Sequence, residues 1–175
     1  MTHLAPSLGV ALALLVIAAG TADVLTRRIP NWLVAAGAIA GFALQCGLSG
    51  WAGAKASALG FALGLAIFMP LFLLRGMGGG DVKLMASVGA IAGPANTFVI
   101  FILTAMIGGV SALGLLLWKG GLGRALRNCA IILREVAQLR APYERNAELS
   151  LDHAASPRLP YAVPIAVACL VFLLL

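Results

Sequence analysis

The sequence predicts an all-α, polytopic membrane protein with about six transmembrane helices in one membrane-embedded domain, residues 1–175. Hydrophobic residues make up 62% of the 175 residues and charged residues only 10%, whereas soluble domains carry about 25% charged residues. The mean hydropathy is +1.04. Long apolar runs recur from end to end, separated by segments that hold most of the charges. This composition is typical of an integral membrane protein rather than of a soluble domain with an anchor.

The apolar runs define the expected spans, because a helix that crosses a bilayer needs roughly 20 apolar residues. In chain order, the expected spans cover residues 7–22, 32–48, 56–74, 82–93, 95–118 and 161–175. The fourth span is short, since it begins after Asp81 and ends at the pair Gly93–Pro94. Arg27 and Arg28 follow the first run instead of preceding it, which is typical of a retained span rather than a cleaved signal peptide.

The basic residues predict the orientation of the chain. With the N-terminus outside, the inside segments are 23–31, 75–83 and 119–160. Of the 12 Lys and Arg residues, only Lys55 then falls on an outside connection. Cytoplasmic segments carry an excess of Lys and Arg, so we expect the N-terminus outside and these three segments in the cytoplasm.

The segment 119–160 is the longest polar stretch. Its first half predicts an amphipathic helix on the cytoplasmic interface, with basic residues toward anionic headgroups. The apolar face of this helix would carry Leu122, Leu126, Cys129, Leu133 and Val136, and the basic face Arg124, Arg127 and Arg134. We expect its second half to be a loop, in which residues 141–157 could gate substrate entry.

Two aspartates stand apart from the other acidic residues, which are Glu135, Glu144, Glu148 and Asp152 in the polar segment. Asp23 ends the first expected span and Asp81 begins the fourth, so the topology places both at the cytoplasmic face. Asp23 could pair with Arg27 at i+4, and Asp81 could be a helix N-cap. However, an acid near a helix C-terminus opposes the macrodipole, and acids at the membrane edge are candidates for function.

Two neighbouring carboxylates can share one proton, which leaves one ionised and one protonated. The ionised carboxylate can activate water while the other donates to a carbonyl oxygen, as in aspartic proteases. Glycines before Asp81 would let a substrate backbone approach. The chain has no P-loop, GxSxG or HExxH motif, and its cysteines form no metal-binding pattern, so we expect no metal and no cofactor.

A second interpretation is a small channel, transporter or assembly scaffold whose aspartates bind a cation or proton. Against it, both acids lie at one face instead of along a path. Thr104 and Ser111 are the main polar residues of the fifth span, and we expect them to hydrogen-bond within their own helix.

Three elements resemble the type IV prepilin peptidases, and in particular their short tight-adherence (Flp) pilus type. These elements are Asp23 with the following "RRIPNW", "GGGDVKL" at 78–84 and "LPYAVPIA" at 159–166. The resemblance covers essentially the full chain in order. Residues 78–81 match the GxGD element of that family.

The resemblance implies an aspartic endopeptidase of the bacterial inner membrane that works at the cytoplasmic face. Its partners would be prepilins or pseudopilins, whose basic leader is cut after a glycine at the edge of an apolar helix; no nucleic acid is expected. Larger family members also N-methylate the new terminus, and we expect cleavage only, without S-adenosylmethionine. The residues that carry over are the catalytic pair Asp23 and Asp81, the motif glycines Gly78 and Gly80, Lys83 as electrostatic support, and Pro30 and Asn31 at the turn into the second span.

Overall fold

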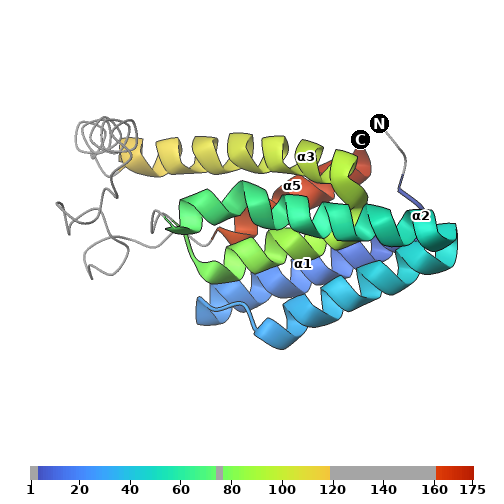
Figure 1. The fold of residues 1–175 in the computed structure, drawn as a ribbon. Helices are drawn as coiled ribbons and strands as arrows, with labels where there is room; N and C mark the ends of the chain where they lie inside the picture. The colour runs from blue at the N-terminus through green and yellow to red at the C-terminus, as the bar shows by residue number, and fades with distance from the viewer. Residues whose placement is uncertain (1–3, 74–76, 119–160) are drawn as a thin grey trace.

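The structure is a computed structural model that describes residues 4–73, 77–118 and 161–175. Within these residues the chain forms helices only, which confirms the all-α prediction (Figure 1). The four helices are α1 (Pro6–Thr26), α2 (Asn31–Leu73), α3 (Gly79–Trp118) and α5 (Ala162–Leu174). The predicted amphipathic helix and loop of 119–160 lie outside the described residues.

Three of these helices are long and apolar enough to cross a membrane, namely α1, α2 and the part of α3 from Gly79 to Gly114. The count of six separate spans is therefore not reproduced in the described part of the chain. Predicted span 32–48 and residues 56–73 of the next span lie within α2, and predicted spans 82–93 and 95–118 lie within α3. The reason is that the expected connection within each pair of spans is a break at a single glycine and not a separate loop.

Gly50 (φ 54°, ψ −130°) breaks α2 and Gly93 (φ 77°, ψ 168°) breaks α3. Only glycine adopts such dihedral angles without steric cost, so both residues suit their positions. Figure 1 shows that α2 and α3 each double back on themselves at the end of the bundle where the chain termini lie. We call residues 31–49 and 51–73 the two arms of α2, and residues 79–92 and 94–118 the two arms of α3.

The first arm of α3 runs through the middle of the core. Leu84, Met85 and Val88 are fully buried there, and α3 packs most extensively against α2. Small residues allow this close approach, because a Cβ on Gly60 would collide with the Gly89 carbonyl oxygen and a Cβ on Gly89 with that of Gly60. Such glycine contacts are typical of helices that associate in membranes.

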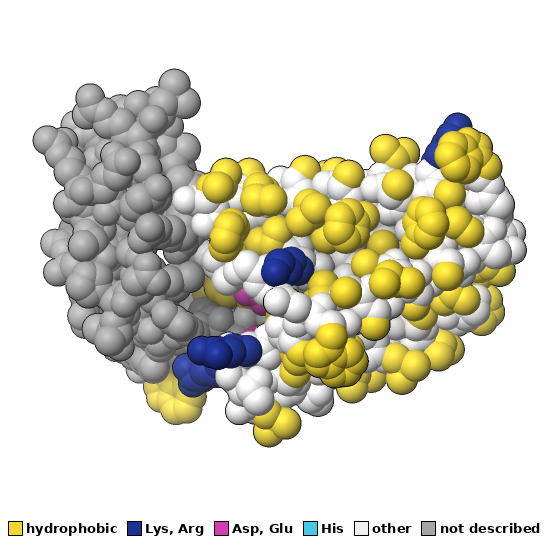
Figure 2. Space-filling view, turned by 60° about the horizontal axis from the view of Figure 1, so that its bottom comes forward, with side chains coloured by type: hydrophobic (Ala, Val, Ile, Leu, Met, Phe, Trp, Pro, Cys, Tyr) yellow, Lys and Arg dark blue, Asp and Glu magenta, His cyan; other side chains and the backbone are white. Residues whose placement is uncertain are grey.

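Helix α5 packs against α1 and α3. Its buried face includes Ile165, Ala168 and Cys169, and Ala166 lies where a Cβ on Gly20 of α1 would come within 3.4 Å. Large apolar side chains such as Leu14, Ile39 and Met106 are exposed on the outside of the bundle. Apolar side chains spread over the visible face in Figure 2, as expected for a membrane protein that faces lipid.

Candidate active site

The two predicted aspartates lie at the same end of the bundle. Asp23 is in the last turn of α1 and Asp81 in the first turn of α3, and each side chain is only 8% exposed. Figure 2 shows acidic side chains deep in a hollow between basic ones, and Asp23 and Asp81 are the acidic residues of the described part of the chain. The negative charge of Asp23 acts on Asp81, so the two carboxylates are close enough to interact.

Asp81 is held by the glycine turn that precedes it. Its backbone N–H donates to the Gly78 carbonyl oxygen at 3.2 Å, and its carboxylate accepts a hydrogen bond from the Gly78 backbone N–H. The alternative interpretation of Asp81 as a helix N-cap is thus modified: α3 begins at Gly79, and Asp81 reaches back from the third helical position, as the acid of a capping box does.

The absence of a side chain at Gly78 makes room for the carboxylate of Asp81. A Cβ built on Gly78 would lie 3.2 Å from Asp81 Oδ2, which is tighter than ordinary van der Waals contact. Gly80 instead faces Ile29, whose side chain would lie 3.5 Å from an added Cβ. The two motif glycines therefore have different surroundings, one beside the carboxylate and one against the loop that follows α1.

Asp23 faces the start of α5. The backbone N–H of Ala162 hydrogen-bonds to the Asp23 carboxylate, and the positive charge of Arg27 acts on it as well. Asp23 Oδ2 is nevertheless buried without a hydrogen-bond partner among the described residues. Buried polar atoms are rarely left unpaired, so this oxygen is a candidate to bind water or substrate.

Tyr161 joins the site from the residue before α5. The negative charge of Asp81 acts on its phenol, whose hydroxyl can donate a hydrogen bond. Sequence reasoning did not assign a role to Tyr161 or Ala162. The "LPYAVPIA" element is the signal for this position, although a short motif does not by itself indicate which of its residues faces the site.

Three other predicted residues lie at the starts of α2 and α3. Lys83 Nζ donates to Asn31 Oδ1 at 3.1 Å and so links the start of α3 to the start of α2. The Pro30 carbonyl oxygen accepts from the N–H groups of Leu33 and Val34 at 3.1 and 3.4 Å, which places Pro30 at the turn into α2, as predicted.

Other polar side chains in the helices are turned toward backbone. Thr104 and Ser111 donate to the carbonyl oxygens of Ile100 and Ile107, which confirms the expected bonding within the helix. Gln45 Nε2 and Ser87 Oγ donate across helices to the carbonyl oxygens of Ile91 and Val34. In the described part of the chain, no group of three or more His, Cys, Asp or Glu residues could hold a metal ion.

Comparison with known proteins identifies one family. A model described as the type IV leader peptidase family matches residues 10–113, more than half of the chain. The matched stretch contains both aspartates, the glycine turn and the Lys83–Asn31 pair. No curated protein and no solved structure matches the chain.

Proposed function

Because this chain belongs to the type IV leader peptidase family, we propose that it is an aspartic endopeptidase that removes the basic leader of Flp-type prepilins or pseudopilins. One observation carries the proposal. Asp23 and Asp81, which are far apart in sequence, are buried together at one end of the bundle. We assign peptide-bond cleavage, and no methyl transfer, to this chain.

The proposed mechanism uses the two carboxylates on one water molecule. The ionised carboxylate takes a proton from water, whose oxygen attacks the carbonyl carbon of the scissile bond, while the protonated carboxyl donates to the carbonyl oxygen. Collapse of the tetrahedral intermediate breaks the C–N bond: the leaving nitrogen takes the proton that the first carboxylate accepted from water, and the new carboxyl group returns its proton to the second carboxylate. The unpartnered Oδ2 of Asp23 supports this mechanism, because it can accept a hydrogen bond from the attacking water.

We further propose that each arm of α2 and α3 crosses the bilayer separately, with α1 and α5 as the other crossings of a single domain in the bacterial inner membrane. The breaks at Gly50 and Gly93 support this topology. The first arm of α3 is about 21 Å long at 1.5 Å per residue, shorter than the roughly 30 Å core, so its crossing requires local thinning of the bilayer. Arg27, Arg28 and Lys83 lie near the aspartates, which favours a cytoplasmic site and an outside N-terminus.

The first prediction concerns the two aspartates. In cells that co-express the chain with a Flp-type prepilin, we expect Asp23→Asn and Asp81→Asn each to reduce leader removal by about 100-fold or more, since asparagine cannot transfer the proton. Leader removal is followed as a mobility shift on an immunoblot that also reports the amount of each variant.

Lys55→Gln is the control, because it removes an exposed charge next to Trp51, near the break of α2 at Gly50. Cleavage that survives either asparagine variant would rule out the aspartate pair. If the wild type cleaves no prepilin, the ion-binding interpretation is favoured instead.

A further inference from the structure

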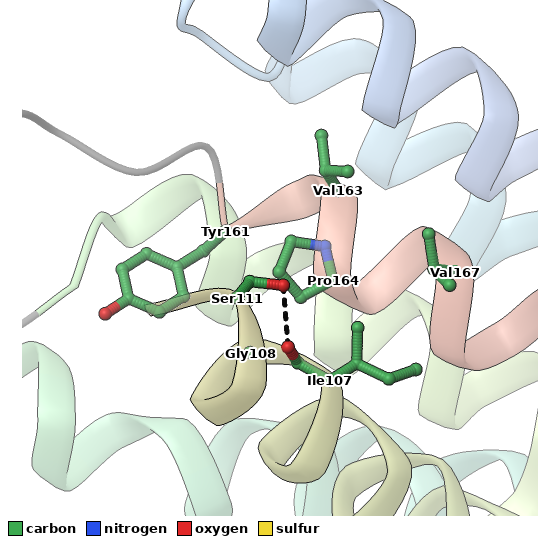
Figure 3. A pocket seen from close by; sticks show the side chains of 7 residues that line it. All are labelled: Ile107, Gly108, Ser111, Tyr161, Val163, Pro164 and Val167. Atoms are coloured by element: carbon green, nitrogen blue, oxygen red, sulfur yellow. Dashed lines mark hydrogen bonds between the residues drawn. The ribbon is translucent and has the colours of Figure 1, made fainter. Parts of the chain in front are cut away.

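A cavity of about 170 Å³ lies between the second arm of α3 and the start of α5 (Figure 3). Figure 3 shows Pro164 at the centre of the lining, with Tyr161 and Val167 on opposite sides of it. The lining residues are Ile107, Gly108, Ser111, Tyr161, Val163, Pro164 and Val167.

The cavity adjoins the candidate dyad through the first residues of α5. Tyr161 lines the cavity and also interacts electrostatically with Asp81. The next residue, Ala162, presents its backbone N–H to Asp23. Val163 and Pro164 then return to the cavity wall. A peptide bond held at the two carboxylates would therefore have a neighbouring side chain within reach of the cavity.

The lining selects for an apolar occupant. Most of its side chains are aliphatic, and the Ser111 hydroxyl is used within the helix, since it donates to the Ile107 carbonyl oxygen at 2.7 Å (Figure 3). An apolar cavity of about 150 Å³ is large enough to bind benzene. The space between α3 and α5 therefore suits one large apolar side chain and not a whole helix.

We propose that this cavity is a specificity subsite for one large apolar side chain from the hydrophobic segment of the substrate, close to the scissile bond. The proposal rests on the proposed peptidase function and adds the feature of the substrate that the enzyme reads. Its link to the dyad through Tyr161 and Ala162 favours a substrate side chain over a lipid chain, because a peptide bond held at the two carboxylates would bring a side chain to this cavity.

The second prediction uses two neighbouring glycines of α3. A Cβ on Gly108 would lie 3.8 Å from Pro164 Cβ, so Gly108→Val extends into the cavity, whereas a Cβ on Gly109 meets nothing within 4 Å. Gly109→Val is thus the matched control, with the same residue types on the same helix. The substrates are a Flp-type prepilin and variants of it in which each large apolar residue of the first two turns of its hydrophobic segment is replaced, one at a time, by alanine.

With the wild type, we expect alanine at one of these positions to lower kcat/KM by roughly 10-fold or more, the usual effect of emptying an apolar pocket. The Gly108→Val enzyme should cleave the parent prepilin as slowly as the alanine variant of the prepilin. The difference in kcat/KM between these two substrates should therefore disappear. Gly109→Val should keep the preference. Equal losses on every substrate, or an unchanged preference in Gly108→Val, would overturn the subsite.

A cross-linking measurement provides a second test. It does not require that the valine variants fold, and it does not require that the substrate is cleaved. The photoreactive residue p-benzoylphenylalanine replaces Val163 in the full chain that also carries Asp81→Asn, and membranes with the prepilin are irradiated. An adduct with the hydrophobic segment of the prepilin supports the subsite. Adducts only with lipid or with another part of this chain overturn it. If the wild type cleaves the prepilin but neither result appears, the subsite fails while the peptidase function stands.

Discussion

The residues around the two aspartates come from α2, α3, α5 and the turn before α3, and they make different kinds of contact. Gly78 leaves space for the Asp81 carboxylate and Ala162 donates its backbone N–H to Asp23. Lys83 reaches Asn31, and so ties together the two chain segments that follow the aspartates. Because Lys83 is bound to another side chain and is two residues from Asp81, we interpret it as a positioning residue rather than a catalytic one.

The third prediction follows from this hydrogen bond. Lys83→Met and Asn31→Ala should each lower kcat/KM for prepilin cleavage by about 10-fold, since small displacements of catalytic groups are costly. The double variant should lose little more than either single variant, because both remove the same interaction. An exposed hydrogen bond contributes only about 1 kcal/mol to stability, so the protein should still accumulate in membranes. Fully additive losses, or full activity in Lys83→Met, would contradict the positioning role.

Among the elements, the first arm of α3 determines where Asp81 lies. It is buried among α1, α2 and α5, and its contact with the second arm of α2 depends on Gly60 and Gly89. A side chain at either glycine would push the two arms apart and move the glycine turn away from α1. The same small residues that allow close packing therefore also set the distance between α2 and the arm of α3 that carries Asp81.

The fourth prediction compares two glycines of α2. Gly60→Ala places a Cβ against the Gly89 carbonyl, and we expect it to lower the free energy of unfolding in detergent by about 1–3 kcal/mol, as overpacking commonly does. Gly47→Ala adds a Cβ with nothing within 4 Å and should leave stability unchanged or raise it by up to about 1 kcal/mol, because alanine favours a helix more than glycine does. Equal stability of the two variants in a denaturant titration would show that the contact is not tightly packed.

For the molecule as a whole, the bundle has two unlike ends. One end carries Asp23, Asp81 and the basic residues beside them, and the other carries the breaks at Gly50 and Gly93. This separation agrees with the distribution of basic residues that the sequence analysis used to orient the chain, in which Lys55 is the exception. A cytoplasmic active site would place the Gly50 and Gly93 end at the outer face.

The fifth prediction tests this orientation. Single cysteines replace Ser49 beside the α2 break or Thr26 at the end of α1, both exposed, in a chain whose Cys46, Cys129 and Cys169 are changed to serine or alanine. In spheroplasts, a membrane-impermeant maleimide should label Ser49→Cys directly and Thr26→Cys only after lysis. The reverse pattern would invert the topology, and labelling of neither before lysis would argue against separate crossings by the arms of α2.

Some features of this protein depend on local composition, and the sequence determined these by itself. Apolar runs of sufficient length predict helices that face lipid, and helices are the regular structure formed by residues 4–73, 77–118 and 161–175. Asp81 as a possible N-cap predicted that a helix starts here, and α3 begins two residues earlier, at Gly79. Such features follow from hydropathy and backbone freedom, which neighbouring residues in the sequence are enough to define.

Only the tertiary structure decided how these helices divide and what meets at their ends. The expected loop between residues 48 and 56 is a break at one glycine, because helical hydrogen bonding continues on both sides of Gly50. The contact of Ala162 with Asp23, the Lys83–Asn31 hydrogen bond and the cavity at Gly108 each join residues that are distant in sequence. These contacts depend on the close packing of α1, α2, α3 and α5, and hydropathy along one segment carries no information about the distance between two helices.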